Sequence, residues 1–317
     1  EPETATAWIA ETLKAAGAAI VNGQDPSVLP KARKNKVELA GTRKAHIRDG
    51  AAMARFLHWI DREAVGQGEL AVMAKLEEFR GADSLHKGAS FTTIAGAGSN
   101  GAIVHYRSST ETERKVEKGT FLLIDSGAQY LDGTTDITRT IAVGRVPKRL
   151  REHYTLVLKG HIAVATARFP KGTGGIALDG FARRALWQAG LDFDHGTGHG
   201  VGVYLGVHEG PARLSPLSQV PLEPGMILSN EPGFYETGSH GIRLENLVVV
   251  TESAKPGFLE FETITFCPFD RRAIVVAMLT AEERRWLDAY HARTRDLLVG
   301  QVKGADRAWL LRMTAPL

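Results

Sequence analysis

The 317-residue sequence predicts an α+β fold in which helices cover an antiparallel sheet. Segments with helical spacing of apolar residues alternate with strand-like segments, in the order helix pair, strands, helix pair, strands. Two of the expected hairpins also resemble each other, because each carries an acidic residue on both arms. The repeated order indicates a coarse internal duplication, within one large domain or about two smaller ones.

The predicted helices rest on apolar spacing and on start signals. Segment 53–60 places apolar residues at i, i+3, i+4 and i+7, which is one face of a helix. Thr280 and Glu283 form a capping box that starts the last helix. In chain order, the expected helices are 4–16, the segment around 53–60, 69–80, 151–168, 178–189 and the one that begins at Thr280.

The predicted strands lie between these helices. The Asp-Gly step at 132–133 is a hairpin turn signal, so we expect Asp132 to serve only as a turn residue. Residues 236–241 supply the turn of a second hairpin. In chain order, the expected strands are 18–23, 90–95, 102–106, 120–130, 136–144, 201–207, 225–235 and 241–251.

Composition excludes several classes of protein. A formal charge of +3 calls for neither a nucleic acid nor an anionic membrane as partner. The basic run at 31–36 lacks aromatic residues, and we expect it to be a solvated linker. No apolar run reaches the roughly 18 residues that a membrane span needs. Cys267 is the single cysteine, so we expect it to pack as a small hydrophobe in a reducing cytoplasm.

Four acids on the two hairpins form the first candidate site. Asp125 and Asp136 belong to one hairpin, and Glu231 and Glu245 belong to the other. Like charges that face each other across a strand pair are destabilising, and burying an unpaired carboxylate costs several kcal/mol. Arg243 lies two residues before Glu245, but it offers one positive charge against four negative ones. Two divalent cations would balance the four carboxylates.

A glycine-rich segment, "HGTGHGVGVYLGVH" at 195–208, carries three histidines. Its glycines speak against a zinc-binding helix, and they allow the backbone to approach a ligand closely. Only one of His195, His199 and His208 need bind a metal, and the others could orient substrate or move protons. His105 is ambiguous, because one histidine in an apolar strand is usually a core residue. We expect the remaining histidines to be structural or solvated: His46, His58, His86, His153, His161, His240 and His291.

The segment "GAGSNG" at 96–101 matches the dinucleotide-binding pattern. The residues that follow it, 102–106, are strand-like and offer no helix N-terminus for a pyrophosphate. We therefore expect no dinucleotide site.

The motifs "DSGAQYLDGTTDITRT", "HGTGHGVGVYLGVHEGP", "SNEPGFY" and "GIRLEN" occur in this order over about 120 residues. Together they resemble those of the pita-bread metallopeptidases, and among these the aminopeptidase P (X-Pro aminopeptidase) family of the cytosolic, three-domain type. The resemblance implies the pita-bread fold, with a pseudo-twofold internal duplication. It implies a cytoplasmic hydrolase that removes the first residue from peptides with proline in second position, through a hydroxide that bridges two divalent ions.

The same resemblance assigns roles to residues. It implies metal ligands at Asp125, Asp136, His199, Glu231 and Glu245, with Asp136 and Glu245 bridging the two ions. It places His105, His195 and His208 around the substrate, Glu231 at proton transfer, and Arg243 and Tyr235 in a hydrogen-bond relay behind the metals. Oxygen-rich ligation with one imidazole favours Mn²⁺, with Zn²⁺ or Co²⁺ as alternatives.

The resemblance also divides the chain. Residues 1–30 are expected to be the C-terminal remnant of a preceding domain plus a linker, and residues 31–317 the pita-bread catalytic domain with a C-terminal extension. Position 1 is Glu, so we expect the chain to be a piece of a longer protein. Family members form dimers through this domain, which leaves a homodimer open. Two alternatives remain: a prolidase that cleaves only X-Pro dipeptides, and a non-catalytic pita-bread module that binds peptides.

Overall fold

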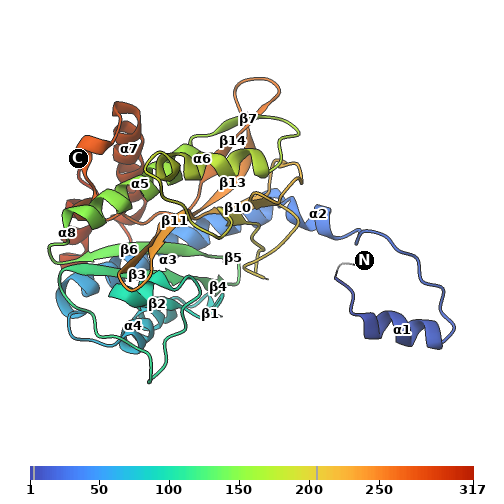
Figure 1. Cartoon of the computed structure of the whole chain (residues 1–317), viewed down its shortest axis with the longest axis horizontal. Helices are drawn as coiled ribbons and strands as arrows, with labels where there is room; N and C mark the ends of the chain where they lie inside the picture. The colour runs from blue at the N-terminus through green and yellow to red at the C-terminus, as the bar shows by residue number, and fades with distance from the viewer. Residues whose placement is uncertain (3, 205) are drawn as a thin grey trace.

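Helices on both sides of antiparallel strands dominate the computed structural model, which describes residues 1–2, 4–204 and 206–317. In Figure 1, α5 (Lys148–Ala165) and α6 (Ile176–Trp187) lie on one side of the central strands, and α4 (Glu69–Gly81) lies on the other. The long α3 (Lys36–Glu63) packs against α4. Helix pair, strands, helix pair, strands is the order that the sequence predicted, and it is confirmed.

The first half places an antiparallel hairpin next to α3 and α4. Its strands form two sheets, in the orders β2-β3-β6 and β1-β4-β5. Asp125 pairs with Thr138, and the same register continues to Tyr130 and Gly133, so the chain turns at 131–132 as predicted. The elements are β1 (His86–Ala89), β2 (Ile94–Ala97), η1 (Gly98–Ala102), β3 (Thr120–Ser126), β4 (Ala128–Tyr130), β5 (Gly133–Thr134) and β6 (Ile137–Val143).

The second half repeats this plan with a longer hairpin. Its sheets have the orders β10-β13-β14-β7, β11-β12 and β8-β9. The pairs Asn230–Asn246 and Gly233–Arg243 share one register, which places Glu231 and Glu245 opposite each other, as expected. The strands are β7 (Arg168–Pro170), β8 (Gly198–His199), β9 (Arg213–Leu214), β10 (Ile227–Asn230), β11 (Gly233–Glu236), β12 (His240–Arg243), β13 (Asn246–Glu252) and β14 (Phe258–Thr263).

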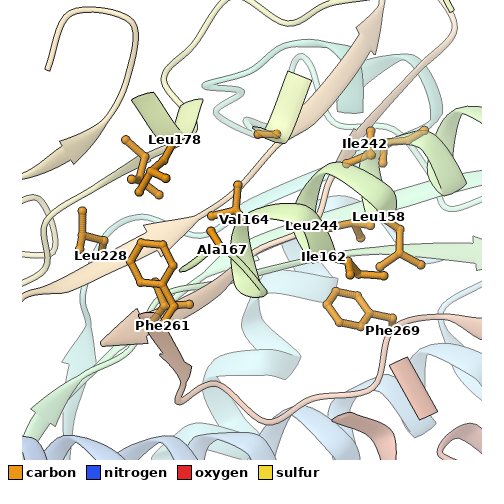
Figure 2. Close-up of a cluster of buried hydrophobic side chains, with 14 of the residues drawn as sticks. Leu158, Ile162, Val164, Ala167, Leu178, Leu228, Ile242, Leu244, Phe261 and Phe269 are labelled. Carbon is orange, nitrogen blue, oxygen red and sulfur yellow. The ribbon is translucent and has the colours of Figure 1, made fainter. Parts of the chain in front are cut away.

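Two large clusters of buried apolar side chains stabilise the two halves of the structure. The larger core lies between α5, α6 and the second-half strands, and Figure 2 shows Leu158 and Ile162 of α5 beside Phe269. The other core packs Leu122 and Ile124 of β3 against α3 and α4. Each fully buried side chain of this size contributes about 1.5–3 kcal/mol. The cores therefore fix the outer faces of both hairpins.

Capping residues set the ends of the main helices. The Asn35 side chain accepts from the backbone N–H of Glu38, and the Glu38 carboxylate accepts from the backbone N–H of Asn35. Thr280 and Glu283 form the predicted capping box at the start of α7. The remaining helical elements are α1 (Ala7–Ala15), α2 (Val28–Ala32), η2 (Arg271–Ala273), η3 (Val276–Met278), α7 (Ala281–Leu298) and α8 (Gly304–Met313).

Three strand predictions are wrong. Residues 18–23 are exposed, and no described strand lies beside them to accept their backbone bonds. Residues 102–106 form the end of a 3₁₀ helix and a turn, in which the N–H of Tyr106 donates to the carbonyl of Ile103 at 3.1 Å. The described residues of 201–207 form a loop, which the Gly202 N–H closes by donating to the Gly206 carbonyl at 3.0 Å; Leu205 lies outside the described residues.

The glycines at 96–101 serve packing. Residues 98–102 form the short 3₁₀ helix η1, so the dinucleotide pattern is followed by neither a strand nor an α-helix. A Cβ at Gly241 of β12 would lie 1.6 Å from the Gly101 carbonyl oxygen. The backbone of β12 therefore lies directly on η1, and only glycine fits this contact.

The basic run at 31–36 is not a solvated linker. Lys34 is buried, and its ammonium donates to Glu209 Oε1 at 2.5 Å. Lys31 pairs with the other carboxylate oxygen of Glu209 at 3.1 Å. Residues from 36 onward already belong to α3. The prediction failed because the acidic partner lies far along the chain.

The cysteine and several of the remaining histidines lie in the interior of the fold. Cys267 is free and fully buried, as predicted. His46, His58, His161, His240 and His291 are buried. Among the described helices, none combines the length and the apolar character of a membrane span.

Because His291 is buried in its neutral form, we expect it to lower the free energy of unfolding in acid. Burial lowers its pKa to about 3, and its Nε2 accepts the N–H of Phe269 at 3.1 Å. An unfolded chain protonates histidine near pH 6.5, so the unfolded state binds more protons between about pH 6.5 and 3, and the free energy of unfolding falls as the pH drops. His291→Gln keeps an acceptor and removes this titration. Urea unfolding should show that the loss between pH 7 and 5 is about 2 kcal/mol smaller in the variant; equal losses would contradict the burial argument.

Candidate metal and catalytic site

A cavity of about 650 Å³ brings together the residues that the sequence singled out. It is lined by residues of both hairpins and of the histidine segment. Tyr235 lies behind this lining, in contact with Arg243 and His195. The predicted site residues that line the cavity are His105, Asp125, Asp136, His195, His199, His208, Glu231, Arg243 and Glu245.

His199 faces carboxylates rather than hydrogen-bond donors. Its Nε2 lies 3.4 Å from Asp136 Oδ2 and 3.4 Å from Glu231 Oε1. Its Nδ1 lies 2.9 Å from the Gly200 carbonyl, which can only accept, so the ring proton belongs on Nδ1. The Nε2 lone pair therefore points at negative oxygens. One ligand atom each from Asp136, His199 and Glu245 also lie within 4.8 Å of one another.

The acids of the cavity are electrostatically strained. Burial, with the nearby Asp125 carboxylate, raises the pKa of Asp136 well above its usual value. Burial and then Asp136 raise the pKa of Glu245 in the same way, and burial raises the pKa of Glu231. Each of these carboxylates needs a compensating positive charge in order to stay ionised at neutral pH.

Two carboxylate oxygens also lack a partner. Among the described residues, Asp125 Oδ1 and Glu245 Oε1 are buried and accept no hydrogen bond. Buried polar atoms are rarely left unpaired. An oxygen-rich donor set with one imidazole suits hard to borderline divalent cations, so the residues present fit a metal centre.

A hydrogen-bonded chain runs from Asp125 to His195. Arg243 donates to Asp125 Oδ2 at 2.5 Å and to the Tyr235 hydroxyl at 2.6 Å. Burial raises the pKa of Tyr235 to about 12, so its O–H donates to His195 Nε2 at 2.8 Å. Burial and then Arg243 lower the pKa of His195 to about 4, which keeps this ring neutral. The chain fixes Asp125 and orients His195 together.

Two hydroxyl groups that the sequence analysis missed hold the glutamates. Thr138 donates to Glu245 Oε2 at 2.7 Å, and Ser229 donates to Glu231 Oε1 at 2.9 Å. Thr138 follows Asp136 by two residues, and Ser229 precedes Glu231 by two. Because residues two apart on a strand share a face, this spacing was a usable signal.

The part of the cavity wall that surrounds the predicted site residues was mostly not predicted. His208 lies with its ring centroid 4.1 Å from that of His199, and Arg213 pairs with His199 in the short β8-β9 sheet. Loops and strand ends supply most of the wall, and they carry no periodic pattern. Gly196, Gly198 and Gly200 also line the cavity, in the segment that we expected to approach a ligand closely. The unpredicted lining residues are Phe91, Thr92, Ile94, Val104, Tyr106, Arg107, Glu209, Gly210, Arg213 and Ser215.

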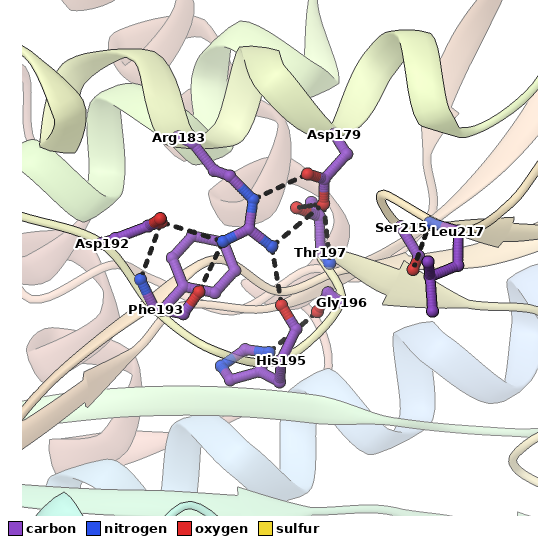
Figure 3. A network of polar contacts seen from close by, with 9 residues as sticks. All are labelled: Asp179, Arg183, Asp192, Phe193, His195, Gly196, Thr197, Ser215 and Leu217. Atoms are coloured by element: carbon purple, nitrogen blue, oxygen red, sulfur yellow. Dashed lines mark hydrogen bonds and ion pairs between the residues drawn. The ribbon is translucent and has the colours of Figure 1, made fainter.

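Arg183 of α6 anchors the start of the histidine segment. Figure 3 shows its guanidinium between Asp179 and Asp192, with one nitrogen donating to the His195 carbonyl at 2.7 Å. It also donates to Asp179 Oδ2 at 2.6 Å, and Asp179 accepts from Thr197 Oγ1 at 2.7 Å. Apart from the short strand β8, the glycine-rich segment has no regular structure, so these side-chain contacts with α6 fix its start.

Two similar halves, with four carboxylates and one imidazole where they meet, define the pita-bread class of metalloenzyme fold. Residues 40–252 match metallopeptidase family M24, and residues 257–317 match the C-terminal region of peptidase M24. The chain belongs to metallopeptidase family M24.

Within this family, the chain is similar to proteins named as aminopeptidases P. A probable Xaa-Pro aminopeptidase P of Laccaria bicolor is 47% identical over 302 residues, which are 90% of this chain and 47% of that protein. Aminopeptidase P1 of Lotus japonicus is 44% identical over 325 residues, covering 92% and 49%. The chain thus spans about half the length of the curated relatives it matches.

The fold of the chain is also similar to those of solved peptidase structures. The X-prolyl aminopeptidase of Caenorhabditis elegans, described as a cytosolic enzyme with a di-nuclear active site, superposes with a TM-score of 0.89 at 38% identity, covering 93% of this chain and 50% of that one. A Xaa-Pro dipeptidase from Bacillus anthracis superposes with a TM-score of 0.74 at 31% identity, covering 85% and 72%.

Arg183→Met should destabilise the protein by about 3–5 kcal/mol in urea unfolding, because it leaves the buried Asp179 carboxylate unpaired. Arg168→Met is the matched control, since Arg168 pairs with Glu260 on the surface. Its loss should stay below about 1 kcal/mol. Equal losses in the two variants would show that Arg183 is not a structural anchor.

Proposed function

We propose that this chain contains the catalytic centre of an X-Pro aminopeptidase, a hydrolase that releases the first residue of peptides whose second residue is proline. The meeting of Asp125, Asp136, His199, Glu231 and Glu245 in one cavity carries the proposal. The names of the relatives from Laccaria bicolor and Lotus japonicus, and of the Caenorhabditis elegans structure, support this reaction.

The cavity would hold two divalent cations. Asp136 and Glu245 would bridge them, Asp125 would bind one, and His199 with Glu231 would bind the other. The raised pKa values of Asp136, Glu231 and Glu245 support this placement, since four negative charges balance two doubly positive ions. We propose Mn²⁺ for the oxygen-rich donor set, with Zn²⁺ and Co²⁺ as alternatives.

Such ions, when bound, lower the pKa of water and polarise a carbonyl. The residues of the chain do the remaining work. Glu231 would accept the proton of the attacking water and return it to the departing proline nitrogen. His208 would lie at the scissile carbonyl, while His105 and His195 would hold the proline region of the substrate. The bonds from Arg243 through Tyr235 to His195 support a fixed, neutral imidazole for that task.

Selectivity for proline follows from backbone chemistry. The nitrogen of an X-Pro bond has no hydrogen, so a peptidase that orients its substrate through that N–H fails on it. A site that holds the peptide's first residue and the proline ring does not need this bond. We propose peptides with an N-terminal X-Pro pair as the substrates.

The organisation of the whole protein is part of the proposal. We propose that residues 1–30 are the end of a preceding domain plus a linker, and that residues 31–317 are the catalytic domain with a C-terminal extension. The absence of buried residues in α1 supports this division. We also propose a cytoplasmic location, in line with the cytosolic Caenorhabditis elegans enzyme, and a homodimer through the catalytic domain.

Asp136→Asn should remove at least one bound Mn²⁺ and nearly all turnover, because a bridging carboxylate contacts both ions. Metal content after dialysis against Mn²⁺, measured by mass spectrometry, and hydrolysis of an X-Pro-Y peptide test this. Asp132→Asn is the control: Asp132 lies in the turn of the same hairpin, where it pairs with Arg48, and it does not line the cavity. A variant at 136 that keeps two ions and full activity would refute the bridging role. Wild-type protein that takes up no Mn²⁺ would favour a peptide-binding module.

Substrate length separates two peptidases. The full-length protein loaded with Mn²⁺ should release the first residue of X-Pro-Pro-Ala at a rate at least comparable to that for the dipeptide X-Pro. Release can be followed by chromatography of the free amino acid. Cleavage confined to the dipeptide would instead make the protein a prolidase, the activity named for several similar structures.

A further inference from the structure

A second cluster of metal-ligand side chains lies outside the cavity, on the back of the β11-β12 hairpin. Glu236 and His240 pair across the end of this hairpin, and His153 of α5 meets them. One ligand atom from each of the three lies within 4.8 Å of the other two. Tyr235 and Arg243 occupy the opposite face of the hairpin, toward the proposed catalytic centre.

The two imidazoles are arranged as a facing pair. His153 Nδ1 lies 3.2 Å from His240 Nε2, and the rings are stacked at an interplanar angle of 15°. His240 Nδ1 lies 2.9 Å from Ser239 Oγ and 3.4 Å from Glu236 Oε2. The cluster therefore presents nitrogen and carboxylate donors close together.

The donors are in the protonation states that a metal requires. Burial lowers the pKa of His153, and burial together with His153 lowers the pKa of His240 to about 4, so both rings are neutral at pH 7. Arg149 donates to Glu236 Oε1 at 2.7 Å and keeps that carboxylate ionised, with a lowered pKa. Among the described residues, Glu236 Oε2 is buried and accepts no hydrogen bond.

We propose that His153, Glu236 and His240 bind one Zn²⁺ ion, separate from the ions of the cavity. Two imidazoles and one carboxylate form a ligand set typical of zinc, whereas the oxygen-rich cavity suits harder ions. Zn–N bonds of about 2.0–2.1 Å require the three donor atoms, which lie within 4.8 Å of one another, to draw closer around the ion, with His240 binding through one of its two nitrogens. His153 and Glu236 are only partly buried, so the ion can enter from solvent.

A bound ion would connect two elements. Glu236 and His240 belong to the hairpin, and His153 belongs to α5. Zinc would cross-link them and raise the melting temperature of the folded protein, because binding to the folded state alone stabilises it. The proposal is independent of the catalytic one, since no ligand is shared.

The test compares zinc content and thermal stability of the full chain. After dialysis against equal concentrations of Mn²⁺ and Zn²⁺, the wild-type protein should carry one more zinc per chain than His153→Gln or Glu236→Gln. Zinc should raise the melting temperature of the wild type and should raise that of both variants less. Glu77→Gln is the control, because the His86–Glu77 pair, at 3.4 Å, provides two donors and no third one joins them among the described residues.

Equal zinc content in the wild type and in both variants would overturn the proposal, as would an equal zinc-induced thermal shift. Using two variants covers the case in which one fails to fold. Titration of the Asp136→Asn variant with Zn²⁺ keeps the two proposals distinguishable. That variant should lose ions from the cavity and still bind zinc at His153, Glu236 and His240.

Discussion

Mutual repulsion among four carboxylates in one cavity is the constraint on which the rest of the structure depends. Burial raises the pKa values of Asp136, Glu231 and Glu245, and a protein gains nothing in stability from such a group unless it binds something positive. Apart from Arg243, which pairs with Asp125, the polar surroundings orient the acids rather than neutralise them. Thr138 and Ser229 each donate to one carboxylate oxygen, and Glu245 Oε1 accepts no hydrogen bond from the described residues. The folded chain thus accepts a local energetic cost that a bound cation would relieve.

Internal duplication explains how the acids come together. Each half supplies one hairpin with two of them, held from outside by its own helix pair and hydrophobic core. The halves join directly at the site, where the backbone N–H of Glu245 donates to the carbonyl of Thr138 at 3.1 Å. Neither half alone would complete the cavity. His199, from the short β8 strand, adds the one described imidazole that faces two of the acids.

The acids, the helix order and the two hairpin turns could be predicted, because strand alternation, helical spacing and turn residues are local signals. The strand predictions at 102–106 and 201–207 failed where tertiary contacts override local preference: β12 packs directly on η1, and Gly202 closes a loop. Arg183 and the cavity walls also escaped prediction. Their roles depend on partners that only the fold brings near, such as the His195 carbonyl beside α6.

The ion pairs from Lys31 and Lys34 to Glu209 connect the start of the chain to the wall of the cavity. Glu209 lines the cavity and directly follows His208, so the short segment before α3 braces one wall of the centre. A truncation within the basic run would remove these ion pairs and leave every carboxylate of the cavity in the chain. A part of the chain with an intact pocket therefore has to include Lys31 and Lys34, although the sequence alone presents them as a linker.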